Sequence, residues 1–171
     1  MKSEKIRKMI FAALFAALTC TVTAALPIRS PLGGYFNLGD AVILLGALML
    51  GPYWGAAAGG IGAALADLFL GYGIYAPATL VIKALVALTA GLIFLRATKH
   101  KYPILALAAV AGEAVMAAGY FLFEAVLYGV GTASANLLVT NLPQAALSIV
   151  TAAALYFLLE KAKLTRRIQH V

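Results

Sequence analysis

One stretch of the chain, residues 35–91, most constrains what the protein can fold into. It is apolar over nearly its whole length, and yet it contains Asp40, Asp67 and Lys83. A helix that crosses a membrane needs about 20 apolar residues, so the stretch is long enough for more than one crossing. Ionisable side chains are costly inside a bilayer and usually mark a pathway or a pocket. The stretch therefore predicts a membrane protein whose helices form the wall of a polar binding site.

The composition of the whole chain supports this class. Of its 171 residues, 64% are hydrophobic and 11% are charged, and the mean hydropathy is +0.98. Soluble domains are about half apolar and about a quarter charged. At about 20 residues per span, the chain has room for roughly six spans. We expect a single membrane domain over residues 1–171, with no separate catalytic or nucleotide-binding module.

The basic residues are grouped in sequence. The net charge is +7, and eleven of the thirteen Lys and Arg residues fall in three clusters, four in 2–8, three in 96–101 and four in 161–167. Clusters that flank apolar runs are typical of cytoplasmic loops. The charge therefore predicts the orientation in the membrane, and we expect no nucleic-acid partner.

These clusters also decide the number of spans. If Pro52 only kinked one long helix, there would be five spans, and the two later clusters would face away from the first. A tight turn over Gly51–Tyr53 gives six spans and brings all three clusters to the cytoplasmic side. We predict an all-α integral membrane protein, a compact bundle of six transmembrane helices with both termini cytoplasmic. The predicted spans are roughly 9–26, 38–50, 54–70, 77–95, 104–128 and 136–160.

Two early segments have further interpretations. The first span is alternatively a secretory signal peptide, because residues 23–25 resemble a cleavage site, although its length and the following Pro27 favour a span. The segment 27–37 is rich in Pro and Gly, which predicts an irregular loop that can fold over a site as a lid. At its end, Asn37 is expected to cap the next helix with Asp40 in a box-like arrangement, a structural role.

The first helix carries a stripe of small residues. Ala12, Ala13, Ala16 and Ala17 form overlapping Ala-x-x-x-Ala pairs. Such stripes let two membrane helices approach closely. The second helix can be a neighbour in the same bundle or part of another protein, and the sequence leaves both open.

Polar side chains gather near the predicted outer ends of the later helices, beneath the loop at 27–37. Together with the tyrosines around them, they suit an uncharged or zwitterionic aromatic ring that is stacked and hydrogen-bonded. Alternatively, Lys83 pairs with Asp67 or Glu124 only to neutralise buried charge. Glu113 lies nearer the midplane and is interpreted as a hydrogen-bonding residue in helix packing. The predicted polar contacts are Lys83, Glu124, Asn141 and Gln144, and the predicted ring contacts are Tyr35, Tyr75 and Tyr120.

No pattern in the sequence supports an enzyme. There is no Ser-His-Asp set, no His pair and no Gly-rich phosphate loop. The single cysteine, Cys20, has no His or Cys at metal-ligand spacing. We expect no catalytic residue, no metal site and no cofactor in this chain.

Four motifs give the chain a family resemblance. They are NLGDAV at 37–42, LGP at 50–52, GGIGAALAD at 59–67 and APATLVIK at 76–83. With six spans, a basic start and the Ala-x-x-x-Ala stripe, they resemble the substrate-binding S components of energy-coupling factor (ECF) vitamin transporters. The first and last motifs look most like the branch associated with pyridoxine, hydroxymethylpyrimidine and related precursors.

The resemblance implies a function and a set of partners. A vitamin or vitamin precursor would bind in a pocket that opens to the outside of a prokaryotic cytoplasmic membrane. The chain would dock, through Ala12, Ala13, Ala16 and Ala17, on a transmembrane coupling protein with two ATPase subunits. Toppling of the chain in the lipid would then deliver the vitamin, and the partners would hydrolyse the ATP.

Two other functions stay open from the residues alone. A stand-alone secondary transporter or channel for a small polar solute would usually show paired repeats and broken helices, and the sequence has one short helix without a counterpart. An interaction-only membrane protein would leave Lys83 and Glu124 with no purpose beyond pairing with each other.

Overall fold

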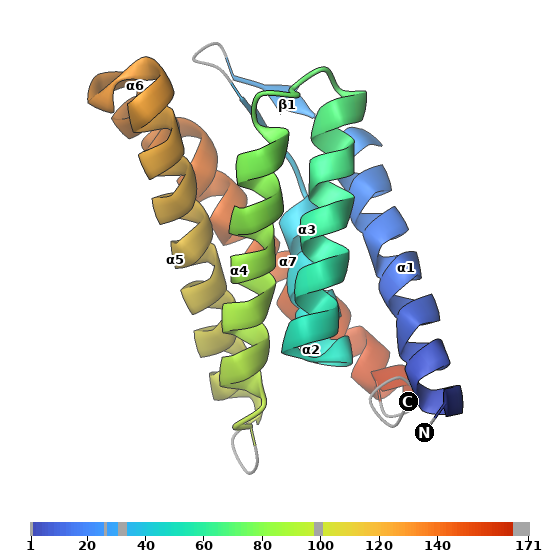
Figure 1. The fold of residues 1–171 in the computed structure, drawn as a ribbon. Helices are drawn as coiled ribbons and strands as arrows, with labels where there is room; N and C mark the ends of the chain where they lie inside the picture. Colours follow the sequence, from blue (N-terminus) through green and yellow to red (C-terminus); the bar gives the residue numbers. More distant parts are fainter. Residues whose placement is uncertain (1, 26, 31–33, 98–100, 166–171) are drawn as a thin grey trace.

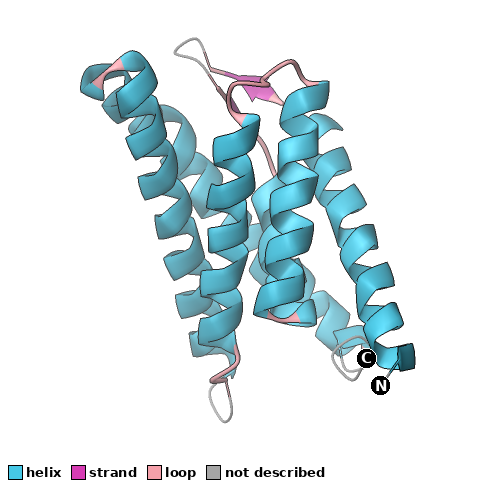
Figure 2. Cartoon of the chain, viewed as in Figure 1, coloured by secondary structure: helices cyan, strands magenta, loops and turns pink. Residues whose placement is uncertain are grey.

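The computed structural model describes residues 2–25, 27–30, 34–97 and 101–165. The helices lie alongside one another, and a short hairpin and α6 lie at the end opposite the start of α1 and the end of α7 (Figure 1). Almost all of the described chain is helical (Figure 2), which confirms the all-α class. The elements are α1 (Lys2–Ala25), β1 (Ile28–Arg29), β2 (Tyr35–Phe36), α2 (Gly39–Leu50), α3 (Pro52–Phe69), α4 (Ala76–Phe94), α5 (Lys101–Tyr128), α6 (Val130–Asn136), the π-helix η1 (Leu137–Asn141) and α7 (Leu142–Lys161).

Four helical segments of the described chain are long and apolar enough to cross a membrane. They are 4–25, 76–94, 101–128 and the continuous run 130–161. By contrast, α2 has only 12 residues, about 18 Å at 1.5 Å per residue, and the glycines and Asp67 of α3 lower its hydropathy. Six helices therefore form the described bundle when 130–161 is counted as one, while the crossing of the membrane by all six stays a prediction.

The break between α2 and α3 is made by one residue. Gly51 has a φ of 84°, a left-handed conformation that costs glycine little. Pro52 follows at the start of α3, where its missing N–H would have no helical partner. The structure thus has two separate helices here, as the tight-turn interpretation requires.

Two boundaries differ from the prediction. The last continuous helical run, 130–161, begins at Val130 and not near residue 136, because Gly129 at a φ of 86° reverses the chain in one residue after α5. The segment 27–37 is not wholly irregular, since β1 and β2 pair antiparallel with Ile28 opposite Phe36 and Arg29 opposite Tyr35. Residues 31–33 of this segment lie outside the described chain, as do Lys99, Arg166 and Arg167 of the basic clusters.

Glycine lets α3 approach its neighbours closely. A Cβ added to Gly62 would collide with the backbone carbonyl of Ala16 on α1, and one added to Gly60 would lie 2.7 Å from the carbonyl oxygen of Leu80 on α4. Close backbone contact through small residues is the usual way that membrane helices associate. The Ala- and Gly-rich sequence of α3 is therefore explained by its position between α1 and α4 (Figure 1).

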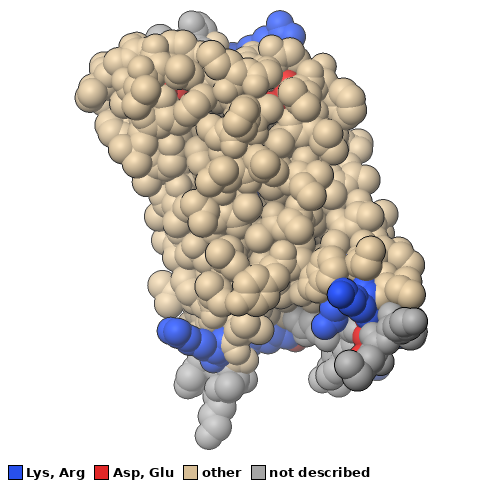
Figure 3. Space-filling model, viewed as in Figure 1, with Lys and Arg blue, Asp and Glu red and all other residues tan. Residues whose placement is uncertain are grey.

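The charged side chains divide the surface into zones. On the face shown in Figure 3, most Lys and Arg atoms gather at the end where α1 starts, a smaller group lies at the opposite end, and the middle band has no charged atoms. A central apolar band with most basic residues at one end is the pattern expected of a protein in a bilayer.

Replacing Gly62 with alanine tests the close α1–α3 contact. We expect Gly62→Ala to cost about 1–3 kcal/mol through overpacking, because the new methyl group forces the two backbones apart. Gly131→Ala is the matched control, since no atom lies within 4 Å of its added Cβ. Thermal unfolding in detergent, followed by the fluorescence of Trp54, measures both. Equal midpoints for the two variants would contradict the close contact.

Candidate functional site

A polar cavity lies among the helix ends nearest the hairpin. Its free volume is about 30 Å³, room for one or two water molecules, so its own side chains nearly fill it. All seven predicted site residues line it. The complete lining is Thr23, Gly34, Tyr35, Asn37, Asp40, Ile43, Ala63, Asp67, Tyr75, Thr79, Lys83, Tyr120, Glu124, Thr140, Asn141 and Gln144.

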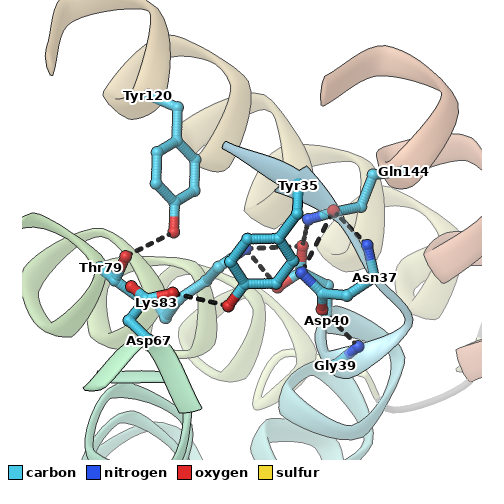
Figure 4. A network of polar contacts seen from close by, with 9 residues as sticks. All are labelled: Tyr35, Asn37, Gly39, Asp40, Asp67, Thr79, Lys83, Tyr120 and Gln144. Carbon is cyan, nitrogen blue, oxygen red and sulfur yellow. Dashed lines mark hydrogen bonds and ion pairs between the residues drawn. The ribbon is translucent and has the colours of Figure 1, made fainter. Parts of the chain in front are cut away.

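A buried ion pair forms the floor of this site. The Lys83 ammonium lies 2.6 Å from Oδ1 of Asp40 and donates a 2.7 Å hydrogen bond to Oδ2. Asp40 is fully buried and Lys83 is 3% exposed. The Gln144 amide donates a further 2.6 Å hydrogen bond to Asp40. The pair thus joins α2 to α4, and the amide adds α7 (Figure 4).

This arrangement corrects two predictions. Lys83 forms its ion pair with Asp40 and not with Asp67 or Glu124. Asp40 does not cap α2; instead Asn37 Oδ1 accepts a 2.8 Å hydrogen bond from the N–H of Gly39, the first residue of α2. Only spacing along the chain suggested a cap, and packing of α4 against α2 brings a lysine to the same carboxylate.

The hairpin is tied to the last helix by the same network. The Asn37 backbone N–H donates a 2.9 Å hydrogen bond to Oε1 of Gln144, and the Asn37 side-chain amide donates a longer one of 3.4 Å to the same oxygen. Gln144 therefore links the entry to α2 with the buried Asp40 carboxylate (Figure 4). A change at Gln144 would disturb both.

Two tyrosines orient two further carboxylates. The Tyr35 hydroxyl donates a 2.6 Å hydrogen bond to Oδ1 of Asp67, and the Tyr75 hydroxyl donates a 3.5 Å one to Oε1 of Glu124. Burial and the Asp67 carboxylate raise the pKa of Tyr35 above its ordinary value, so the phenol keeps its proton and remains the donor. Each carboxylate has one oxygen fixed by a phenol.

Aromatic rings complete the walls. Lys83 lies 5.0 Å from the centroid of the Tyr120 ring, a cation–π distance, and the Tyr120 hydroxyl shares a 2.9 Å hydrogen bond with Thr79. The rings of Tyr35 and Tyr72 lie 4.8 Å apart at the hairpin side. The site therefore combines flat apolar surfaces with hydrogen-bonding groups.

A π-helix carries part of the lining. Thr140 and Asn141 belong to η1, the wide turn between α6 and α7, and both side chains are buried. π-turns inside helices are frequent at functional sites, because the extra residue redirects the side chains around it. The one sequence signal for this turn is Pro143, which removes a backbone donor just after it.

Asp40, Asp67 and Thr79 are lining residues that we did not predict as ligand contacts. A buried acid inside an apolar helix was the available signal for the two carboxylates. Glu113, predicted to form a hydrogen bond in helix packing, is 2% exposed, and neither carboxylate oxygen has a hydrogen-bond partner among the described residues. In that part of the chain, no three His, Cys, Asp or Glu residues are grouped as metal ligands would be.

Removing the charge of Lys83 tests the role of the ion pair. Lys83→Met leaves Asp40 as a buried charge without its cation, which we expect to cost about 3–5 kcal/mol. The double variant Lys83→Met/Asp40→Asn should recover most of this loss, because no charge is then unpaired. Lys101→Met is a matched control, since its pair with Glu160 is about a third exposed and such pairs contribute about 0–1 kcal/mol. Thermal unfolding that shows equal losses of stability in Lys83→Met and Lys101→Met would contradict this role.

Comparison with known proteins gives concordant results. The family described as "ECF-type riboflavin transporter, S component" matches residues 3–161. The thiamine precursor transporter HmpT of Lactococcus lactis is 31% identical over 163 residues, 94% of this chain and 92% of HmpT. A Pyrococcus woesei protein, described only as an uncharacterized protein in a gap 3' region, is 40% identical over 144 residues, 82% of this chain and 94% of its own length.

The family match covers nearly the whole chain, and the helical membrane bundle agrees with it. The chain belongs to the S-component family of ECF-type transporters.

Proposed function

We propose that this S component captures a small heteroaromatic vitamin precursor, of the pyridoxine or hydroxymethylpyrimidine type, and delivers it across the cytoplasmic membrane of a prokaryotic cell. The observation that carries the proposal is the polar cavity at the hairpin end, where charged, amide and phenol groups are buried together among aromatic rings. Buried polar groups around a concave, partly aromatic site are typical of small-molecule binding.

The small volume of the cavity and the similarity of the chain to HmpT both support a substrate with one small ring. The free volume of about 30 Å³ is far below the several hundred Å³ of most ligand pockets, so even a single ring requires the walls to move apart. A fused-ring flavin with its sugar-alcohol chain would require much more. HmpT, which is similar over most of both chains, is described as a thiamine precursor transporter.

The hairpin is the element that moves in this proposal. Tyr35 reaches from β2 to Asp67 on α3, and Asn37 reaches to Gln144 on α7. These are a small number of polar links, and the hairpin has only two residues in each strand. Release of these links opens the cavity to the outer side, with both termini and the basic clusters on the inner side.

A surface groove supports the proposed docking of partners. Ala12, Ala13, Ala16 and Ala17 line an apolar groove of about 650 Å³ between α1 and α3, with Trp54 and Phe69 among its other walls. Ala13 and Ala17 are exposed. We propose that a transmembrane coupling protein with two ATPase subunits packs here and supplies the ATP hydrolysis. A stand-alone secondary transporter or channel would need no such groove.

Ligand binding tests the first half of the proposal. Purified protein, titrated with water-soluble vitamins and precursors and followed by native mass spectrometry and Trp54 fluorescence, should bind one small ring tightly. Asn141→Ala, which removes a lining amide, should weaken that binding at least tenfold, about 1.4 kcal/mol. Thr151→Ala, on α7 but outside the cavity lining, should leave it unchanged. A folded protein that binds no compound of the panel would overturn the proposed function.

Uptake tests the second half. Ala13→Leu/Ala17→Leu fills the groove with exposed side chains and should abolish most vitamin uptake by cells that also make the energising subunits, while ligand binding to the purified protein is retained. Ala114→Leu/Ala118→Leu is the matched control, an exposed pair four residues apart on α5. Equal uptake by the two double variants would contradict docking at the groove.

A further inference from the structure

Apart from Asp40 Oδ1, which lies against the Lys83 ammonium, three buried polar atoms of the cavity lack a hydrogen-bond partner in the described chain. They are Oδ2 of Asp67, Oε2 of Glu124 and Nδ2 of Asn141. The residues are only 2%, 4% and 6% exposed, and all three line the cavity. Buried polar groups are almost always satisfied by protein, water or ligand. The hydrogen bonds that these atoms can still form indicate which chemical groups a ligand would present to them.

The carboxylates of Asp67 and Glu124 are each positioned to accept a hydrogen bond from a ligand. In each of them the other oxygen accepts a phenol hydrogen bond, from Tyr35 to Asp67 and from Tyr75 to Glu124. This contact limits rotation of the carboxylate and leaves the second oxygen unused. Two acceptors and one amide donor therefore remain for a ligand.

The charges of the site also favour a ligand that donates hydrogen bonds. Among the described residues, the buried Lys, Arg, Asp and Glu side chains are one lysine and four carboxyls, Asp40, Asp67, Glu113 and Glu124. The ion pair with Asp40 occupies the lysine, and no described Lys or Arg is ion-paired with Asp67 or Glu124. A ligand that presents an oxygen anion would meet unpaired carboxylates, whereas one that presents N–H groups would satisfy them.

We propose that the substrate is an amino-substituted nitrogen heterocycle, which donates N–H groups to Asp67 and Glu124 and accepts a hydrogen bond from Asn141. This inference rests on the proposed function. It narrows the proposed substrate from the pyridoxine and hydroxymethylpyrimidine types to the one that carries an amino group. A planar amino group offers two N–H donors for the unused oxygens of the two carboxylates, and a ring nitrogen beside it can accept the hydrogen bond from Asn141. A hydroxylated pyridine, with an acidic ring oxygen in place of the amino group, fits the same atoms less well.

The ring itself would lie against tyrosine. Tyr35, Tyr75 and Tyr120 come from the hairpin, the start of α4 and α5, and all three line the cavity. Flat aromatic surfaces bind a heterocycle of either type, so they supply affinity without choosing between them. The choice is made by the polar atoms, because a site built around hydrogen bonds strongly rejects an analogue that leaves its buried groups unpaired.

Two compounds that differ in one group test the proposal. The probes are 4-amino-5-hydroxymethyl-2-methylpyrimidine and its 4-oxo counterpart, titrated calorimetrically into the purified full-length protein, with pyridoxine as a third probe. We expect the amino compound to bind at least tenfold more tightly than the other two. Glu124→Gln and Asp67→Asn, which turn an acceptor oxygen into an amide donor, should each reduce this ratio and improve relative binding of the 4-oxo compound.

Glu113→Gln is the control for these variants. Glu113 is a buried carboxyl on the same helix as Glu124, but it does not line the cavity. It should leave the ratio unchanged, which separates a change of recognition from a general effect on the fold. A ratio that moves equally in Glu113→Gln and Glu124→Gln would overturn the assignment.

The outcomes separate this inference from the proposed function. If pyridoxine or the 4-oxo compound binds as tightly as the amino compound, the substrate class is wrong while vitamin-precursor binding stands. If no member of the whole vitamin panel binds to the folded protein, the proposed function falls as well. An amino preference that is lost in Glu124→Gln and Asp67→Asn supports both.

Discussion

The contact on which the site depends is the ion pair of Lys83 and Asp40. Two charges withdrawn from water are costly, and only close geometry with additional hydrogen bonds offsets that cost. Here both carboxylate oxygens lie within 2.7 Å of the ammonium, and Gln144 satisfies one of them again. Because α2, α4 and α7 each supply one group, these helices are held in one arrangement, and the remaining polar groups inherit their positions from it.

Small residues allow this polar centre to be sealed. Where α3 crosses α1 and α4, its glycines have no side chain to hold the backbones apart. The helix α2 lies in the interior, with Gly39–Met49 buried. Tight contact around the centre excludes lipid and water, which strengthens each electrostatic contact inside it. The same density leaves little free space, so binding and movement of the walls are coupled in this protein.

Much of the bundle was predictable from residue patterns, and the network was not. Apolar runs with Gly and Pro between them predicted the helices, and the polar residues predicted on the later helices lie around one cavity, while their contact with a ligand stays a prediction. Asp40 was misassigned, because a carboxylate near a helix start satisfies a local capping rule while its actual partner is 43 residues away. The hairpin, the early start at Val130 and the π-turn depend on tertiary packing and on single backbone conformations, which residue patterns do not encode.

The shortness of α2 has a consequence for the passage of a solute. From Asp40 to its last residue, Leu50, the helix rises about 15 Å, roughly half the thickness of a hydrocarbon core. Beyond that end lies a hollow of about 530 Å³, with Lys8 and Lys101 among its lining residues. The insulating layer between the polar centre and the opposite end of the bundle is therefore thin, and a molecule that leaves the cavity in that direction has about half a bilayer left to cross.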